Sequence, residues 1–213
     1  MMKYTGRIII TLVGIGLVSI VRMYGILYYN VPPNQFPLVG LFVVLVLWTL
    51  GSPYDKLKFL SERDVLTKLY NRRYMQKAFP KLFTLAARKQ EKLILYFIDV
   101  DNFKLINDTH GHEIGDQVLQ RIASVLTRHS SKRDLVVRWA GDEFLILSPN
   151  TDDYSKASMI SSIQNELMLS SQELNFSISV SIGSAIYPDQ AQSLDGILHV
   201  ADQDMYALKL GAS

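Results

Sequence analysis

The sequence of 213 residues contains no cysteine. This absence excludes disulfide bonds and thiolate metal sites, and it fits a reducing compartment. The chain also lacks a strong excess of charge, because 22 Lys and Arg residues stand against 20 Asp and Glu residues and the formal net charge is +2. So small a charge gives no argument for nucleic acid as a partner, and none is predicted. Internal repeats are absent too, so we expect one compact domain behind an apolar N-terminal part.

Hydrophobic residues make up 48% of the chain, and their excess lies near the N-terminus. Two apolar segments, about 7–29 and 36–52, approach the roughly 20 residues that a membrane-spanning helix needs. Uncharged residues link them, whereas Lys and Arg residues flank the pair, so the positive-inside rule places both ends in the cytoplasm. Residues 1–53 are therefore predicted to form a transmembrane hairpin of a multi-pass protein in the inner (cytoplasmic) membrane, followed by a helical linker over 54–63.

A signal peptide and a buried helical pair are the alternatives for these apolar segments. A signal peptide is disfavoured, because no small-x-small cleavage site follows the first segment and a second apolar segment comes at once. A helical pair buried in a soluble fold stays open as an alternative. With the hairpin interpretation, the domain formed by residues 64–213 lies in the cytoplasm.

The remainder of the chain alternates between helical and strand patterns. A continuous apolar run over 92–100 predicts a buried strand, and strict alternation over 176–182 predicts a half-buried one. Helical patterns cover 71–90, 114–128, 154–168 and 194–210, and Pro80 is expected to kink or break the first of them. Together with the hairpin described next, these elements predict an α/β domain with a mainly antiparallel sheet flanked by helices.

Two apolar runs, 135–139 and 144–147, flank the short turn Ala140-Gly141-Asp142-Glu143. Short apolar runs interrupted by a glycine turn predict a β-hairpin. Two adjacent carboxylates at its tip repel each other, and a cation between them would reverse that cost. Mg²⁺ prefers carboxylate oxygens and usually binds together with substrate phosphates. Plain solvated charge is the ordinary alternative for two acids at a turn.

Asp99 and Asp101 stand at the end of the first buried strand, and alternation directs both side chains to the same face. An acid that closes an apolar strand is partly desolvated and needs a partner. If the hairpin pairs beside this strand, Asp99 joins Asp142 and Glu143 in a carboxylate cluster suited to two-metal phosphoryl transfer. Helix capping is the alternative role for the strand-end acids.

Several segments, in order, resemble the GGDEF family of diguanylate cyclases, and the match covers Asp64 to about Lys209. The segments are 64–73 (D-x-L-T-x-L-x-N-R-R), 99–108 (D-x-D-x-F-K-x-x-N-D), 111–116 (G-H-x-x-G-D), the hairpin tip, 179–183 and 201–209. The resemblance implies a palm-like nucleotidyl-cyclase fold. It also implies the condensation of two GTP into cyclic di-GMP and two pyrophosphates by a homodimer that holds one GTP per subunit.

The resemblance also implies a role for each matching residue. Asp99 and Asp142 would bind Mg²⁺, or Mn²⁺ in its place, with help from the Val100 carbonyl. Glu143 would be a further metal ligand or would help to activate the attacking 3′-hydroxyl. The substrate-binding residues would be Asn107 and Asp116 for the guanine edge, and the Phe103 backbone, Lys104 and Lys209 for the triphosphate. Proteins that bind cyclic di-GMP would act downstream.

The chain departs from the family pattern at three places. Ala140 replaces the first glycine of the signature, which adds one methyl group, and we expect activity to survive. In the family's inhibitory R-x-x-D site, Asp134 is kept but Ser131 stands where arginine is expected. Serine cannot replace the bidentate binding of phosphate by arginine, so weak or absent product inhibition is predicted. The Gly-Arg pair that usually follows the lysine is not matched after Lys209, so one phosphate contact is expected to be missing.

Two other functions compete with the cyclase. The first is a catalytically silent GGDEF-like module that binds GTP or cyclic di-GMP and acts through protein interaction. Retention of the predicted metal-binding and guanine-binding residues argues against it. The second is another nucleotidyl cyclase or a polymerase palm, which shares the metal-binding carboxylates. The Asn107 and Asp116 pair and the segment 111–116 argue against that alternative.

Overall fold

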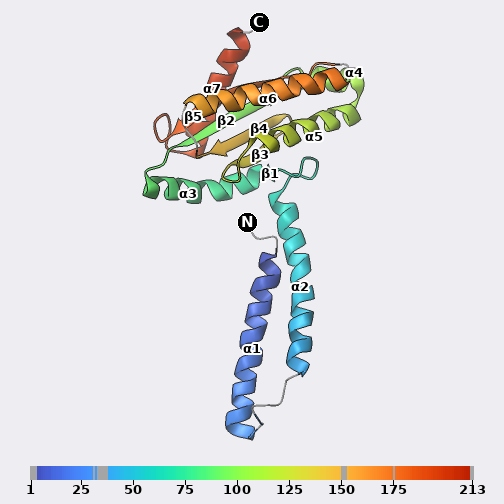
Figure 1. Cartoon of the computed structure of the whole chain (residues 1–213), viewed down its shortest axis with the longest axis vertical. Coiled ribbons are helices and arrows are strands. Elements are labelled where there is room, and N and C mark those ends of the chain that lie inside the picture. The colour runs from blue at the N-terminus through green and yellow to red at the C-terminus, as the bar shows by residue number, and fades with distance from the viewer. Residues whose placement is uncertain (1–3, 31, 33–37, 150–152, 175, 212–213) are drawn as a thin grey trace. The chain divides into compact units, whose positions relative to one another are not determined.

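The structure, a computed structural model, describes residues 4–30, 32, 38–149, 153–174 and 176–211 (Figure 1). It divides into two compact units, one up to Ser61 and one from Glu62 onward. The first unit consists of α1 (Thr5–Tyr29) and most of α2, which runs over Leu38–Glu62. The predicted linker is thus the last part of a continuous helix, because no residue before Glu62 interrupts it.

Residues of α2 contact the first turn of α1. The Asp55 carboxylate accepts hydrogen bonds from the backbone N–H groups of Gly6, at 2.6 Å, and Arg7, at 3.3 Å. These N–H groups have no partner within their own helix, so Asp55 caps α1 from outside. The Arg7 guanidinium donates to the Ser52 hydroxyl at 2.6 Å. The backbones approach so closely that a Cβ added at Gly51 would lie 2.5 Å from the Arg7 Cα.

Membrane spanning is supported for the first predicted segment and not for the second. Among the described residues, α1 is the one helix that is long and apolar enough to cross a membrane, with a mean hydropathy of 2.0 over Gly6–Tyr29. The start of the second predicted span, 36–37, lies outside the described residues. The expectation of a multi-pass protein is therefore unsupported. The described residues contain one helix, near the N-terminus, that is long and apolar enough to span a membrane.

The second unit is built on a five-stranded sheet with the order β1-β3-β4-β2-β5. The strands are β1 (Tyr70–Asn71), β2 (Leu93–Val100), β3 (Leu135–Ala140), β4 (Glu143–Ser148) and β5 (Val180–Tyr187). The pairing of β1 with β3 is parallel, and the other pairings are antiparallel. The prediction of an α/β domain with a mainly antiparallel sheet is confirmed.

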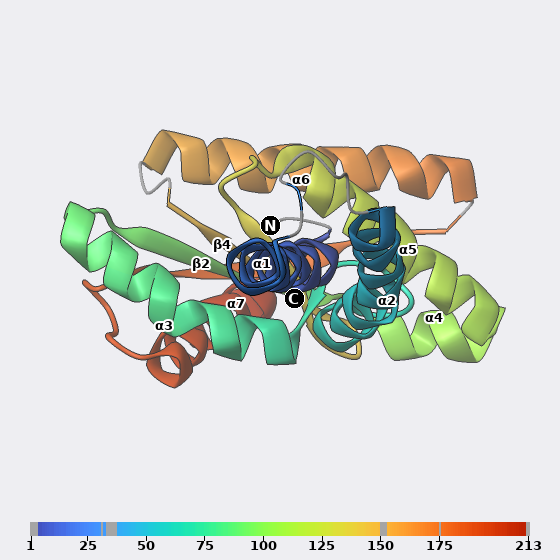
Figure 2. The ribbon, with the colours of Figure 1, turned by 90° about the horizontal axis from the view of Figure 1, so that it is seen from below.

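Helices cover both faces of this sheet (Figure 2). The helices are α3 (Arg72–Lys89), α4 (Phe103–His110), α5 (His112–His129), α6 (Asp153–Leu174) and α7 (Leu194–Gly211). Alternate residues of β2 divide between two buried clusters: Ile98 packs with residues of α4, α5 and α6, and Phe97 packs with residues of α3 and α7. This inner strand is thus buried on both faces, and its one charged residue, Asp99, lies next to its end.

Three local predictions differ from the structure. Pro80 does not break α3, because Phe79 and Phe83 on either side of it are buried against the sheet and Pro80 itself is exposed. The second predicted strand begins later, at Val180, and runs on to Tyr187, because β2 provides partners for that whole stretch. Helix α4 was not predicted, since its polar residues resemble a turn.

Candidate active site

The acids at the hairpin tip lie beside the end of β2. Asp99 stands directly opposite Glu143 in the antiparallel register of β2 and β4. The backbone N–H of Val100 donates to the carbonyl oxygen of Asp142 at 3.3 Å. Because the two strands are neighbours, Asp99, Asp142 and Glu143 lie near one another at the same end of β2 and β4. Their binding of a metal stays a prediction.

Negative charge gathers around Glu143, which is half-buried. Burial raises the pKa of the Glu143 carboxyl above its usual value, and the neighbouring charges of Asp99, Asp142 and Asp202 raise this pKa further. The positive charge of Arg72 lowers the pKa of Glu143, but this effect is smaller than the effects that raise it. Asp202 belongs to α7, and its part in this cluster was not predicted. A site with this much negative charge favours a bound cation.

The residues fit a magnesium ion that shares its coordination with a substrate. Among the described residues, no three His, Cys, Asp or Glu side chains lie close enough together to enclose a metal ion. Magnesium needs no such cage, because it usually keeps several waters and binds through one or two carboxylates and the phosphates of a substrate. Asp99 and Asp142, with the Val100 carbonyl, match that donor set.

Lys209 reaches the same acids from α7. Its Nζ lies 2.5 Å from Oδ1 of Asp99. The helix carries Lys209 to this place because β5 and α7 are in very close contact at Gly183, where an added Cβ would lie 2.1 Å from the Met205 backbone nitrogen. Asp204 strengthens the contact by accepting a hydrogen bond from the backbone N–H of Ser184 at 2.8 Å. Lys209 therefore lies at the carboxylate cluster, and its binding of phosphate stays a prediction.

The predicted guanine-binding residues lie together on α4 and α5. Asn107 packs so tightly against α5 that a Cβ at Gly115 would fall 1.9 Å from the Asn107 Oδ1. Asp116, the next residue, is exposed on α5. Phe103 and Lys104 form the first turn of α4, where backbone N–H groups favour anions. The structure thus brings Asn107 beside Gly115, the neighbour of Asp116, and the Phe103 ring approaches the same point of α5, 3.4 Å from a Cβ added at Gly115.

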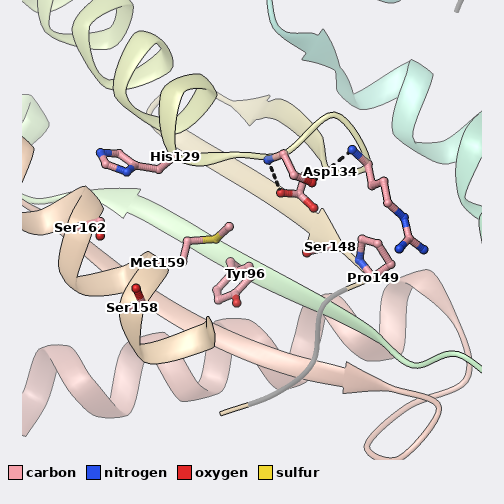
Figure 3. Close-up of a pocket in the computed structure, with 10 residues that line it drawn as sticks. Tyr96, His129, Asp134, Ser148, Pro149, Ser158, Met159 and Ser162 are labelled. Atoms are coloured by element: carbon pink, nitrogen blue, oxygen red, sulfur yellow. Dashed lines mark hydrogen bonds between the residues drawn. The ribbon is translucent and has the colours of Figure 1, made fainter. Parts of the chain in front are cut away.

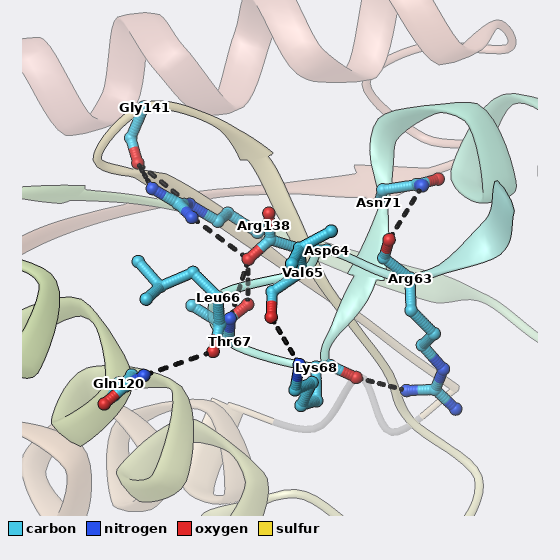
Figure 4. Close-up of polar contacts among 10 residues, drawn as sticks. All are labelled: Arg63, Asp64, Val65, Leu66, Thr67, Lys68, Asn71, Gln120, Arg138 and Gly141. Atoms are coloured by element: carbon cyan, nitrogen blue, oxygen red, sulfur yellow. Dashed lines mark hydrogen bonds and ion pairs between the residues drawn. The ribbon is translucent and has the colours of Figure 1, made fainter. Parts of the chain in front are cut away.

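Arg138 ties the first matched segment to the hairpin tip (Figure 4). Its Nη1 donates to Oδ1 of Asp64 at 3.0 Å, and its Nη2 donates to the Gly141 carbonyl at 2.8 Å. Burial acts to raise the pKa of Asp64, but hydrogen bonds from Thr67 and Arg138 outweigh burial and hold this pKa below its usual value. Arg138 thereby fixes the turn that carries Asp142.

No role for Arg138 was predicted from the sequence. A partial signal was present, because Asp64 begins a segment that resembles the family pattern and Arg138 lies two residues before the hairpin tip. Their partnership joins residues 74 positions apart, however, so it requires the fold.

The stretch from Ser131 to Asp134, which aligns with the family's inhibitory R-x-x-D site, borders a separate cavity of about 550 Å³ (Figure 3). Its lining includes Tyr96, Ser131, Arg133, Asp134, Ser148 and Met159. Asp134 accepts a hydrogen bond from the Ser131 backbone N–H at 2.7 Å, which closes the local turn. The Arg133 guanidinium pairs with Glu91 at 3.2 Å. Ser131 therefore stands where the family pattern has arginine, and the nearby Arg133 already forms an ion pair with Glu91.

We predict that added cyclic di-GMP leaves the rate of GTP turnover nearly unchanged. Ser131 offers no guanidinium for bidentate phosphate binding, so the product has little to hold it at this turn. The measurement is the initial rate at increasing product concentration, with Ser131→Arg as the matched variant that should gain inhibition. Strong inhibition of the unmodified protein that disappears in Asp134→Ala would show the prediction to be wrong.

Comparison with known proteins identifies the family of this chain. Residues 61–212 match the family model described as "Diguanylate cyclase, GGDEF domain". The diguanylate cyclase TpbB of Pseudomonas aeruginosa is 36% identical over 154 residues, which cover 70% of this chain and 35% of TpbB. DosC of Escherichia coli, also a diguanylate cyclase, is 33% identical over 153 residues, which cover 68% of this chain and 32% of DosC.

A solved structure gives the same result for the fold. The coiled coil and GGDEF domain of DgcB from Caulobacter crescentus, in complex with c-di-GMP, aligns with a TM-score of 0.70 and 27% identity, covering 76% of this chain and 88% of that one. The chain belongs to the GGDEF diguanylate cyclase family. It spans about a third of the length of the curated relatives TpbB and DosC.

Proposed function

We propose that the protein is a diguanylate cyclase that condenses two GTP into cyclic di-GMP and two pyrophosphates. The observation that carries the proposal is the register of β2 and β4, which brings Asp99 opposite Glu143 beside Asp142. Asn107 and Asp116 support guanine as the base, since an amide and a carboxylate match its N1 and N2 donors.

In each half-reaction, the 3′-oxygen of one GTP forms a bond to the α-phosphorus of the other, and pyrophosphate leaves. A bound Mg²⁺, or Mn²⁺, would neutralise charge that develops on the phosphate oxygens. Glu143 would be a further metal ligand or would help to take the proton of the attacking hydroxyl, a role that its raised pKa supports because a carboxyl with a raised pKa is a better base. Lys209, Lys104 and the Phe103 backbone would bind the triphosphate.

Turnover requires two copies of the domain. Each copy would hold one GTP, and a two-fold axis between the copies would bring each 3′-hydroxyl to the other nucleotide. Fixing the two nucleotides face to face supplies much of the rate, because a bimolecular encounter becomes an intramolecular one. The homodimer is therefore part of the proposed mechanism, and proteins that bind cyclic di-GMP would receive the product.

We also propose that α1 anchors the protein in the cytoplasmic membrane with the cyclase domain in the cytoplasm, where GTP is available. The support is the apolar character of α1 over Gly6–Tyr29. Fractionation of cells should place the full chain with the membranes. Deletion of the residues up to Tyr29 should release it if the proposal is right.

The full chain, purified in detergent as a dimer and given Mg²⁺ and GTP, should form cyclic di-GMP and two equivalents of pyrophosphate. ATP in place of GTP should give no cyclic dinucleotide, because adenine lacks the donors that Asp116 would accept. Chromatography of the products measures both outcomes. A confirmed dimer that binds GTP but releases no product would favour the catalytically silent module instead.

A further inference from the structure

Asp101, the first residue after β2, has no part in the mechanism described so far, yet its carboxylate is closely held. Its backbone N–H donates to the Ser179 carbonyl at 3.0 Å. Its Oδ2 accepts a hydrogen bond from the Ser179 hydroxyl, and its Oδ1 accepts one from the Ser181 hydroxyl, each at 2.7 Å. Two hydroxyl donors from the neighbouring segment therefore fix both oxygens of this side chain.

Lys209 lies between this carboxylate and the predicted metal ligand. Its Nζ is 2.5 Å from Oδ1 of Asp99 and 3.9 Å from Oδ1 of Asp101. The three side chains are partly sheltered from solvent, with exposed fractions of 32% for Lys209, 22% for Asp99 and 23% for Asp101. The ammonium group thus has two carboxylates within reach and lies closer to Asp99.

A divalent cation at Asp99 would change this balance. The cation and the ammonium group repel each other, and both require the same carboxylate, so Lys209 must move away from Asp99. Asp101 is then the adjacent anion, and the two serine hydroxyls keep it where it is. An ammonium group held by Asp101 stays at the edge of the site, where the phosphates of a bound nucleotide would lie.

We propose that Asp101 is a positioning residue for Lys209. It retains the Lys209 ammonium group beside the metal site once a cation occupies Asp99, and so presents that group to the triphosphate of a guanosine nucleotide. Ser179 and Ser181 serve the same purpose indirectly, because they fix the Asp101 carboxylate. This inference rests on the proposed function, which supplies the cation and the nucleotide.

The test uses the full chain and the probe 3′-deoxy-GTP with Mg²⁺, because this nucleotide lacks the attacking hydroxyl and cannot be condensed. Asp101→Asn keeps the size of the side chain and can still accept from a serine hydroxyl, but it removes the charge. We expect its affinity for 3′-deoxy-GTP to fall about fivefold, the scale of a partly exposed ion pair. The KM for GTP should rise by a similar factor while kcat changes much less.

A double-variant cycle distinguishes positioning from a structural role. In a Lys209→Met background, Asp101→Asn should cause no further loss of affinity, because the ammonium group through which it acts is gone. Asp189→Asn is the matched control: it removes a carboxylate that pairs with Lys92 at 2.5 Å on the surface, and it should bind the probe as the unmodified protein does.

An equal loss of affinity in both backgrounds would overturn the inference, as would a loss accompanied by a lower melting temperature. Unmodified protein that binds 3′-deoxy-GTP but makes no cyclic di-GMP would refute the proposed function alone, and the binding cycle would still decide the role of Asp101. Unmodified protein that does not bind the nucleotide would refute both.

Discussion

If the proposed function holds, Asp142→Asn should lower the rate of cyclic di-GMP formation by about a thousandfold, because it removes a charge that would stabilise the transition state through the bound cation. The substitution keeps the shape of the side chain. The backbone of the turn should also persist, since Val100 donates to the carbonyl of residue 142 and Arg138 to that of Gly141. The measurement is the initial rate of product formation at saturating GTP and Mg²⁺, made alongside a melting curve.

Asp189→Asn provides the control, because it makes the same chemical change at an exposed carboxylate far along the sequence from the hairpin. That variant should retain the full rate. An Asp142→Asn protein that kept more than about a tenth of the rate would show that Asp142 is not needed for the chemistry. A fall in melting temperature of Asp142→Asn large enough to unfold it in the assay would point to a structural role instead.

The second large effect is expected from Gly183→Ala. The added Cβ would lie 2.1 Å from the Met205 nitrogen and 2.2 Å from the Ala201 oxygen. Both are backbone atoms of α7, so no side-chain rotation relieves the overlap and the helix must move away from β5. Overpacking of this kind costs about 1–3 kcal/mol or more, which lowers the melting temperature by roughly 2–4 °C for each kcal/mol.

Gly183→Ala should also raise the KM for GTP in the fraction that remains folded, because a shift of α7 withdraws Lys209 from Asp99. Thermal unfolding and the KM for GTP measure the two effects. Gly16→Ala is the control, since an added Cβ there meets nothing within 4 Å. A Gly183→Ala protein with an unchanged melting temperature would mean that the backbone accommodates the methyl group without moving the helix.

Local sequence patterns predicted those parts of the site that depend on residues adjacent in the sequence. The hairpin was predictable because a short turn separates two apolar runs, and Asp99 because a strand buried on both faces ends there. Once the two elements are assigned, their pairing brings Asp99 opposite Glu143. These features follow from the two-residue period of strands and from turn chemistry.

The remaining contacts required the fold. Lys209 and Asp99 are 110 residues apart, and Asp101 and Ser181 are 80 apart, so no local period relates them. Tertiary packing also overrode two local signals. Burial of Phe79 and Phe83 keeps α3 continuous through Pro80, and pairing with β2 extends β5 beyond the alternating run of serines.

The cap that Asp55 places on α1 gives the two N-terminal helices one preferred register. Sliding α1 by a single turn would move its first N–H groups about 5.4 Å away from Asp55 and leave them without that partner. It would also take the Arg7 backbone away from the space that Gly51 leaves for it. A signal carried by a piston-like displacement of one helix along the other would first have to break this cap, so the pair resists sliding most strongly at the end where Asp55 and Arg7 meet.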